Sequence, residues 1–175
     1  MKRYVVGLDI GTSNLGLCVY DSETRKVVCW QRCSLLLPHQ HRWCEKNIVE
    51  CVARFLKKHS AYFEDAVGVI IEKQMRQPMK GVQWLLAIQN PETAIVVRPQ
   101  DIKRQYHISM GQYEANKKAA CAWAQQYLSE QPQFFSPDCV QAFHKETKQD
   151  DMADALLLVR YFLDTYVEGY TAAKF

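Results

Sequence analysis

Long hydrophobic runs are missing from this sequence of 175 residues. Its longest apolar stretches, such as residues 155–159, are far shorter than the roughly 20 residues that a helix needs to cross a bilayer. The opening residues, MKRYVVGLDIG, also lack the apolar segment ending in small residues that is typical of a secretory signal peptide. We therefore expect neither a membrane protein nor a secreted one, and we assign the opening residues to a first β-strand.

Paired cysteines are missing as well. The seven cysteines are odd in number, and no two of them have Cys-x-x-Cys spacing, which argues against a disulfide framework. Cys18, Cys29, Cys51 and Cys121 fall in apolar stretches, where small reduced thiols commonly pack. This pattern predicts a reducing, intracellular location.

The sequence lacks a large excess of charge of either sign, because it has 22 Lys and Arg residues and 19 Asp and Glu residues, and its formal net charge is only +3. Such a balance indicates an anionic partner weakly, so the distribution of the charges matters more than their sum. No internal repeat, low-complexity tract or linker interrupts the chain, and 48% of its residues are apolar. Length and composition together predict one globular domain covering residues 1–175.

The spacing of apolar residues predicts an α/β fold. Strands are expected over residues 3–10, 15–20, 27–36, 66–72 and 94–98, and helices over residues 42–58, 78–89, 113–128 and 150–168. Short links between the first three strands indicate an antiparallel meander, and the continuous apolar run at 66–72 is typical of a central strand. The order of these elements predicts a mixed sheet flanked by helices.

Acidic residues occur in three of these apolar elements. Asp9 lies within the first strand, Glu72 ends the fourth, and Asp151 and Asp154 share one face at the start of the last helix. Taken singly, each acid is explained by a helix cap or by a solvated strand end. Together they form the all-oxygen ligand set that Mg²⁺ or Mn²⁺ prefers. Two such ions about 4 Å apart can activate a water and stabilise the leaving oxygen of a phosphodiester, so the pattern indicates metal-dependent phosphodiester cleavage.

Three segments carry a resemblance to a known family. They are GLDIGTSNLGLCVYD (7–21), VGVIIEKQ (67–74) and KQDDMADALLL (148–158). In their order and spacing they resemble the RuvC-type Holliday-junction resolvases of the RNase H-like superfamily, most closely the poxvirus and mitochondrial branch. Asp150 departs from the bacterial members, which often carry His there. The resemblance implies an RNase H-like fold, with a five-stranded mixed sheet of three antiparallel strands plus parallel strands, flanked by helices.

The same resemblance implies an activity and its machinery. Two Mg²⁺ or Mn²⁺ ions per active site would be held by Asp9, Glu72, Asp151 and Asp154. Family members are homodimers in which each site nicks one of two like strands of a four-way DNA junction and leaves 5′-phosphate and 3′-hydroxyl ends. A lysine assists catalysis in this family, and we favour Lys117 or Lys118 over Lys103, although the spacing does not decide between them. The location implied is host cytoplasm or virion for a viral protein and the mitochondrion for a cellular one.

Basic and amide side chains cluster near the ends of the predicted core elements. We expect DNA contacts from Lys73, Gln74, Arg76, Lys80, Lys103 and Arg104, and binding should then weaken as salt rises. Trp84 and Tyr106 are candidate wedges for the junction centre. The neighbouring leucines favour a core or dimer-interface position for Trp84 instead.

Four other interpretations of the sequence are possible. HQHRWC at 39–44 suggests zinc but lacks a second ligand pair, so we expect a loop leading into a helix. DIGTSNLG at 9–16 is similar to a phosphate loop of the actin, Hsp70 and sugar-kinase ATPases, yet no second Gly-rich loop follows, and we expect no nucleotide cofactor. An rRNA-processing nuclease of the same superfamily and a non-catalytic module that binds DNA structures remain alternatives. A need for Mg²⁺ or Mn²⁺ in cleavage would separate a nuclease from a binder.

Overall fold

Five strands form one mixed sheet in the computed structural model, which describes residues 2–108, 111 and 113–167. The strands are Tyr4–Asp9 (β1), Leu15–Asp21 (β2), Lys26–Cys33 (β3), Ala66–Glu72 (β4) and Ala94–Val97 (β5). Their order across the sheet is β3-β2-β1-β4-β5. The pairs β1–β2 and β2–β3 are antiparallel, and the pairs β1–β4 and β4–β5 are parallel. The predicted mixed sheet, with its antiparallel meander and added parallel strands, is confirmed.

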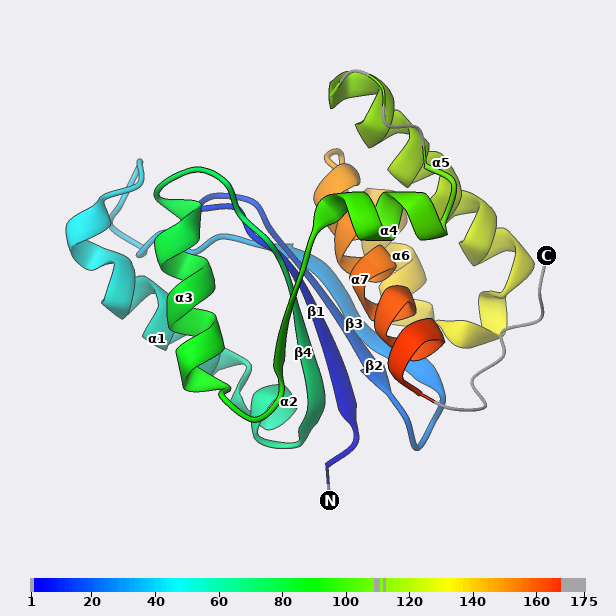
Figure 1. The fold of residues 1–175 in the computed structure, drawn as a ribbon, viewed down its shortest axis with the longest axis horizontal. Coiled ribbons are helices and arrows are strands. Elements are labelled where there is room, and N and C mark those ends of the chain that lie inside the picture. The colour runs from blue at the N-terminus through cyan, green and yellow to red at the C-terminus, as the bar shows by residue number, and fades with distance from the viewer. Residues whose placement is uncertain (1, 109–110, 112, 168–175) are drawn as a thin grey trace.

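Helices cover both faces of the sheet (Figure 1). The α-helices are Ile48–Lys58 (α1), Ser60–Glu64 (α2), Met79–Gln89 (α3), Pro99–Gln105 (α4), Tyr113–Glu130 (α5), Pro137–Lys145 (α6) and Asp150–Tyr166 (α7), and short 3₁₀ turns span Glu45–Asn47 (η1) and Pro132–Phe134 (η2). Figure 1 shows α1 and α3 on one side of the sheet and α4 to α7 on the other. Within the described residues, no helix combines the length and hydrophobicity needed to span a membrane.

Alternation along β1 divides the core into two layers. Val6 and Leu8 pack into the cluster beneath α1 and α3, whereas Val5 packs into the cluster beneath α5 to α7. On the second face the indole of Trp30 stacks on Phe143 with the ring centroids 4.2 Å apart, and its Nε1 donates a hydrogen bond of 2.7 Å to the carbonyl of Met152. This contact ties the beginning of α7 to β3.

Helix α7 lies against the sheet at positions where the strands carry glycine. A Cβ added at Gly16 would lie 1.9 Å from the carbonyl oxygen of Asp151, and one added at Gly7 would lie 2.5 Å from that of Ala155. No side chain could be accommodated at such distances without moving the helix. Because Gly16 is also the direct cross-strand partner of Asp9, this close approach sets the start of α7 beside the Asp9 carboxylate.

Replacing Gly16 with alanine should therefore move the start of α7 and destabilise the fold. Overpacking of a rigid backbone contact costs about 1–3 kcal/mol, which corresponds to roughly 2–12 °C in Tm for a chain of this size. The matched control is Gly81→Ala in α3, where the nearest atom to the new methyl is the tip of the flexible Ile48 side chain at 2.7 Å. Thermal melts of the two variants test this reading of the packing. Equal changes in Tm would contradict it.

Several local expectations need correction. Helices α2, α4 and α6 were not predicted, the third strand ends at Cys33 rather than at residue 36, and residues 42–44 precede the first helical turn. Tyr106 is not available as a junction wedge, because its ring packs on Trp123 and its hydroxyl donates a 2.8 Å hydrogen bond to Asp164. A core position for Trp84 is also wrong, since 60% of this residue is exposed.

Candidate active site

One cleft gathers the acids that the sequence singled out. It has a volume of about 470 Å³, and its lining includes Asp9, Glu72, Asp150, Asp151 and Asp154. It lies where β1 and β4 end and α7 begins, since parallel strands deliver their carboxyl ends to the same edge of a sheet. The structure thus brings together four predicted ligands from three separate elements, together with their neighbour Asp150.

Asp9 and Glu72 interact through their carboxyl groups in the lining of the cleft. Burial, together with the negative charges of Glu72, Asp154 and Asp151, raises the pKa of Asp9 well above its usual value. Burial also raises the pKa of Glu72, although the hydrogen bonds from Asp9 and Gln74 oppose this rise. Two carboxyl groups at such close range repel each other when both are ionised, which favours the protonated form of one of them.

Gln74 fixes the position of Glu72. Its side-chain Nε2 donates to Glu72 Oε2 at 3.1 Å, and its backbone N–H donates to the buried Gln83 side chain of α3 at 2.7 Å. The segment after β4 is therefore anchored to α3, which keeps the carboxylate directed into the cleft. The sequence predicted Gln74 as a DNA contact. In the structure the Gln74 side chain instead hydrogen-bonds to Glu72 and orients it.

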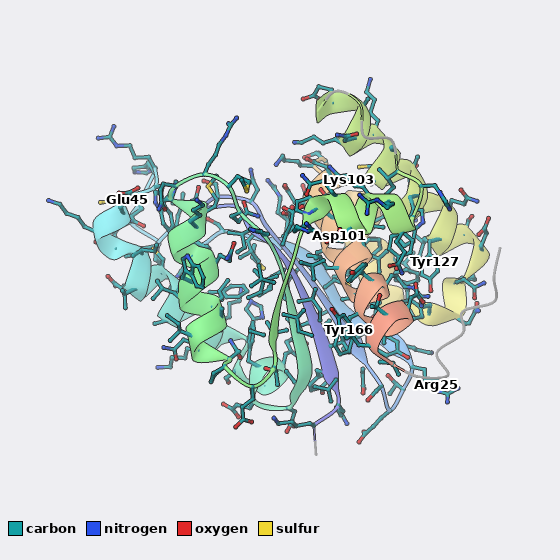
Figure 2. The ribbon with its side chains drawn as sticks, in the orientation of Figure 1. Arg25, Glu45, Asp101, Lys103, Tyr127 and Tyr166 are labelled. Atoms are coloured by element: carbon teal, nitrogen blue, oxygen red, sulfur yellow. The ribbon has the colours of Figure 1, made fainter. Side chains whose placement is uncertain are left out.

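The acids of α7 experience the same crowding. Burial, followed by the charge of Glu72, raises the pKa of Asp154 to about 7, while the charge of Lys103 on α4 opposes the rise. Burial also raises the pKa of Asp151, against the opposing hydrogen bond and charge of Lys148. Lys103 lies on α4 near the end of the sheet where α7 begins (Figure 2). The raised pKa values of Asp151 and Asp154 indicate that the site carries more negative charge than the nearby lysines balance.

Lys117 and Lys148 pair with the two acids that open α7. Lys117 Nζ lies 2.6 Å from Asp150 Oδ2, and Lys148 Nζ lies 2.7 Å from Asp151 Oδ2. Burial alone would raise the pKa of Asp150, but the hydrogen bond from Lys117 and the charges of Lys148 and Lys117 outweigh it and hold this pKa below its usual value. Asp150 is therefore ionised and holds Lys117 at the edge of the cleft.

The candidate lysines and DNA contacts fall in different places. Lys117 and Lys103 line the cleft with the acids, whereas exposed Lys118 lines only a neighbouring groove on α5, which Lys117 also borders. Lys73 lines another groove, beside Trp84 and β5. The other predicted DNA contacts, Arg76, Lys80 and Arg104, lie outside the cleft lining, and Arg76 and Arg104 are exposed.

Sequence reasoning missed several residues of the site. Lys148 was not singled out, although a lysine directly before a helix N-terminus opposes the helix dipole and is an unusual choice. Arg32 on β3 was missed too, and it donates to Asn14 Oδ1 at 2.7 Å and to Glu146 Oε2 at 3.1 Å. These two hydrogen bonds connect the β1–β2 turn to the segment that leads into α7. Only the structure could reveal them, because the three residues are far apart in the sequence.

The donor chemistry of the cleft fits a divalent cation. Carboxylate oxygens are the ligands that Mg²⁺ and Mn²⁺ prefer, and Lys117 and Lys148 balance part of the charge that such an ion would balance. As they stand, no three His, Cys, Asp or Glu side chains in the described part of the chain are arranged to hold a metal ion. Binding of an ion there would therefore require side-chain movement, including displacement of Lys148 from the two oxygens of Asp151.

The sheet order and the acidic cleft define an α/β protein of RNase H-like fold, the fold of the resolvases and related nucleases. The fowlpox virus resolvase, solved with its substrate Holliday junction DNA, superposes with a TM-score of 0.68 at 21% identity, covering 94% of this chain and 99% of that one. A second structure of the fowlpox virus Holliday junction resolvase gives a TM-score of 0.64 at 19% identity, covering 92% of this chain and 98% of that one.

The large terminase nuclease of the thermophilic phage G20c has the same fold, with a TM-score of 0.54 at 16% identity over 91% of this chain and 81% of that one. No protein-family model and no curated protein matches the sequence. The similarity thus shows the fold, and any activity must be argued from the cleft itself.

Proposed function

We propose that this protein is a structure-selective DNA endonuclease that resolves four-way junctions by paired, symmetric nicks. The observation that carries the proposal is the convergence of Asp9, Glu72, Asp151 and Asp154 in one cleft. Buried carboxylates that repel one another destabilise a protein unless a cation balances their charge. A site that retains four of them from three elements is therefore suited to metal-dependent chemistry at a phosphate.

In this proposal the four acids hold two Mg²⁺ or Mn²⁺ ions. Bound there, the ions would supply a water nucleophile of lowered pKa and stabilise charge on the leaving oxygen. Lys117, held by Asp150, would place its ammonium beside the phosphate and stabilise the negative charge that develops on it. Gln74 would keep Glu72 oriented while the substrate binds.

The cationic side chains at the rim of the cleft would contact the DNA backbone. Lys103 lines the cleft directly, and exposed Arg76 and Arg104 extend the positive surface beyond it. Paired nicks need two active sites, so the proposal includes a homodimer. The exposed apolar residues Val49, Trp84 and Ile88 on α1 and α3, which are 60–66% exposed, offer a surface for it.

The two neighbouring lysines should differ sharply in their contribution to catalysis. Lys117→Ala is expected to slow nicking on the order of 10²-fold, because it removes a cation from the site where charge develops. Lys118→Ala should change the rate little, since that side chain does not belong to the lining of the cleft. Single-turnover nicking rates of both variants at saturating enzyme provide the comparison. Equal losses would overturn the assignment of Lys117.

The test of the proposed function compares a synthetic immobile four-way junction with a linear duplex of matched sequence. We expect symmetric nicks in the junction with Mg²⁺ or Mn²⁺, little cutting of the duplex, and no cutting in EDTA. Equal cutting of both substrates would indicate a general DNA nuclease. Binding of the junction with no cutting under any metal would indicate the non-catalytic module instead.

A structured ribosomal RNA precursor added to the same assay covers the remaining alternative. The rRNA-processing interpretation requires metal-dependent cutting of the RNA in preference to the junction. Preference for the junction would support the resolvase proposal.

A further inference from the structure

Lys148 contacts the two acids that open α7. Its Nζ lies 2.7 Å from one carboxylate oxygen of Asp151 and 3.0 Å from the other, and it lies 3.9 Å from Asp150 Oδ2. The Lys148 side chain is 36% exposed, against 12% for each of the two aspartates. The ammonium group thus contacts both oxygens of Asp151 and lies in the lining of the cleft that holds the other acids.

The backbone of Lys148 is fixed by a chain of hydrogen bonds. Its N–H donates to Glu146 Oε1 at 3.0 Å, and the other carboxylate oxygen of Glu146 accepts from Arg32 at 3.1 Å. Arg32 in turn donates to Asn14 in the β1–β2 turn. With its main chain anchored in this way, Lys148 can release Asp151 by rotating its own side chain, with no movement of α7.

The position of Lys148 opposes the dipole of the helix that it precedes. A cation is disfavoured at a helix N-terminus, where the free N–H groups carry partial positive charge. At this site the acids at the start of α7 offset that unfavourable interaction, because a nearby ammonium reduces the repulsion between them. Lys148 therefore performs for Asp151 the electrostatic role that a bound cation would perform.

We propose that Lys148 is an intrinsic counter-cation that exchanges with the divalent metal, occupying Asp151 when the metal is absent and leaving it when the metal binds. The inference rests on the proposed function, in which Asp151 is a metal ligand. Both Asp151 oxygens contact the ammonium group, so an ion can use Asp151 only after Nζ withdraws. The lysine thus competes with the metal and lowers its affinity.

The exchange also couples the metal to DNA. Once released, the ammonium remains in the cleft that a DNA phosphate would enter, where it gains a new anionic partner. A phosphate that draws Lys148 away from Asp151 would equally favour metal binding, because coupling between two ligands is reciprocal. Metal would then bind more tightly when DNA is present, and part of that gain would depend on Lys148.

The experiment measures Mn²⁺ affinity in the absence of DNA, by isothermal titration calorimetry on the full chain. Lys148→Gln should bind Mn²⁺ roughly 2–5-fold more tightly than wild type, because a partly exposed ion pair of this kind contributes a modest free energy. Lys148→Arg, which keeps the charge, should bind like wild type. The control Lys145→Gln removes an equal charge from an exposed position at the end of α6 and should leave the affinity unchanged.

Three results would overturn the proposed exchange between Lys148 and the metal. Equal or weaker Mn²⁺ binding by Lys148→Gln, with intact binding by wild type, would overturn the exchange and leave the proposed nuclease function standing. The same holds if Lys145→Gln tightens binding as much as Lys148→Gln does, since general electrostatics would then explain the effect. Failure of the wild type to bind Mn²⁺ any better than Asp154→Asn would overturn the metal-dependent function and the exchange together.

Discussion

Asp9→Asn is expected to abolish junction nicking, with a rate loss on the order of 10³-fold or more, while junction binding persists. The expected size follows from the several kcal/mol that metal ions contribute at a transferring phosphate and from the tenfold rate change that accompanies each ~1.4 kcal/mol. Asparagine has nearly the same shape as aspartate but offers one neutral oxygen ligand. Because the change adds no negative charge to the cleft that we propose holds DNA, affinity for the junction should be unchanged or slightly higher.

Gel-shift affinities in EDTA and single-turnover nicking rates in Mg²⁺ separate these two effects. Asp138→Asn is the matched control, because it makes the same chemical change at an exposed position in the first turn of α6. Wild-type nicking rates in Asp9→Asn would remove Asp9 from the machinery. A joint loss of binding and cleavage would indicate damage to the fold rather than to the chemistry.

Asp154→Asn should raise the thermal stability of the metal-free protein above that of wild type, even though it should also inactivate the enzyme. The pKa of Asp154 is raised to about 7 from an ordinary value of 3.8, with burial as the largest cause. Ionising this group at neutral pH therefore destabilises the folded state. A shift of this size corresponds to a few kcal/mol at most, shared among the coupled acids, and each kcal/mol is about 2–4 °C in Tm.

The dependence on pH follows from the direction of the shift. A carboxyl whose pKa is higher in the folded state than in the unfolded state binds more protons when folded, so the stability it contributes is lost as pH rises from about 4 through about 7. The difference in Tm between Asp154→Asn and wild type should thus be small at pH 4 and largest above pH 7. Taking this difference cancels the opposite trend from His59, whose pKa burial lowers to about 4.

Mg²⁺ should reverse the order of stability. A ligand that binds only the folded state stabilises it, so the metal should raise the Tm of wild type and have little effect on Asp154→Asn. Differential scanning fluorimetry across pH, with EDTA or with Mg²⁺, gives both comparisons. A metal-free Asp154→Asn that melts at or below wild type at pH 8 would contradict the view that the acids repel one another.

Much of the fold could be predicted because apolar spacing determines which face of each element is buried. The five strands lie within a few residues of their expected bounds, and α1, α3, α5 and α7 were anticipated for the same reason. The missed helices α4 and α6 are short, and α4 buries only Ile102, so each offers only about two turns of apolar spacing to recognise. Each begins with proline in its first turn, a local indicator of a helix start that apolar spacing ignores.

The acid cluster could be anticipated for a different reason, namely that carboxylates at apolar strand ends and helix starts are conspicuous. The choice between Lys117 and Lys118 could not be made from sequence, since adjacent helical residues point about 100° apart and only packing shows which one faces the cleft. Lys148 was missed because its partner Asp151 lies only three residues further along the chain, so the two resemble an ordinary surface ion pair. Burial of the aspartates, visible only in the structure, distinguishes the two cases.

Anomalous diffraction from crystals grown or soaked with Mn²⁺ tests the proposed metal site most directly. We expect anomalous density between the carboxylates of Asp9, Glu72, Asp151 and Asp154, with Lys148 turned away from Asp151. Well-ordered carboxylates that enclose no Mn²⁺ at concentrations supporting nicking, or Mn²⁺ bound only elsewhere on the protein, would contradict it.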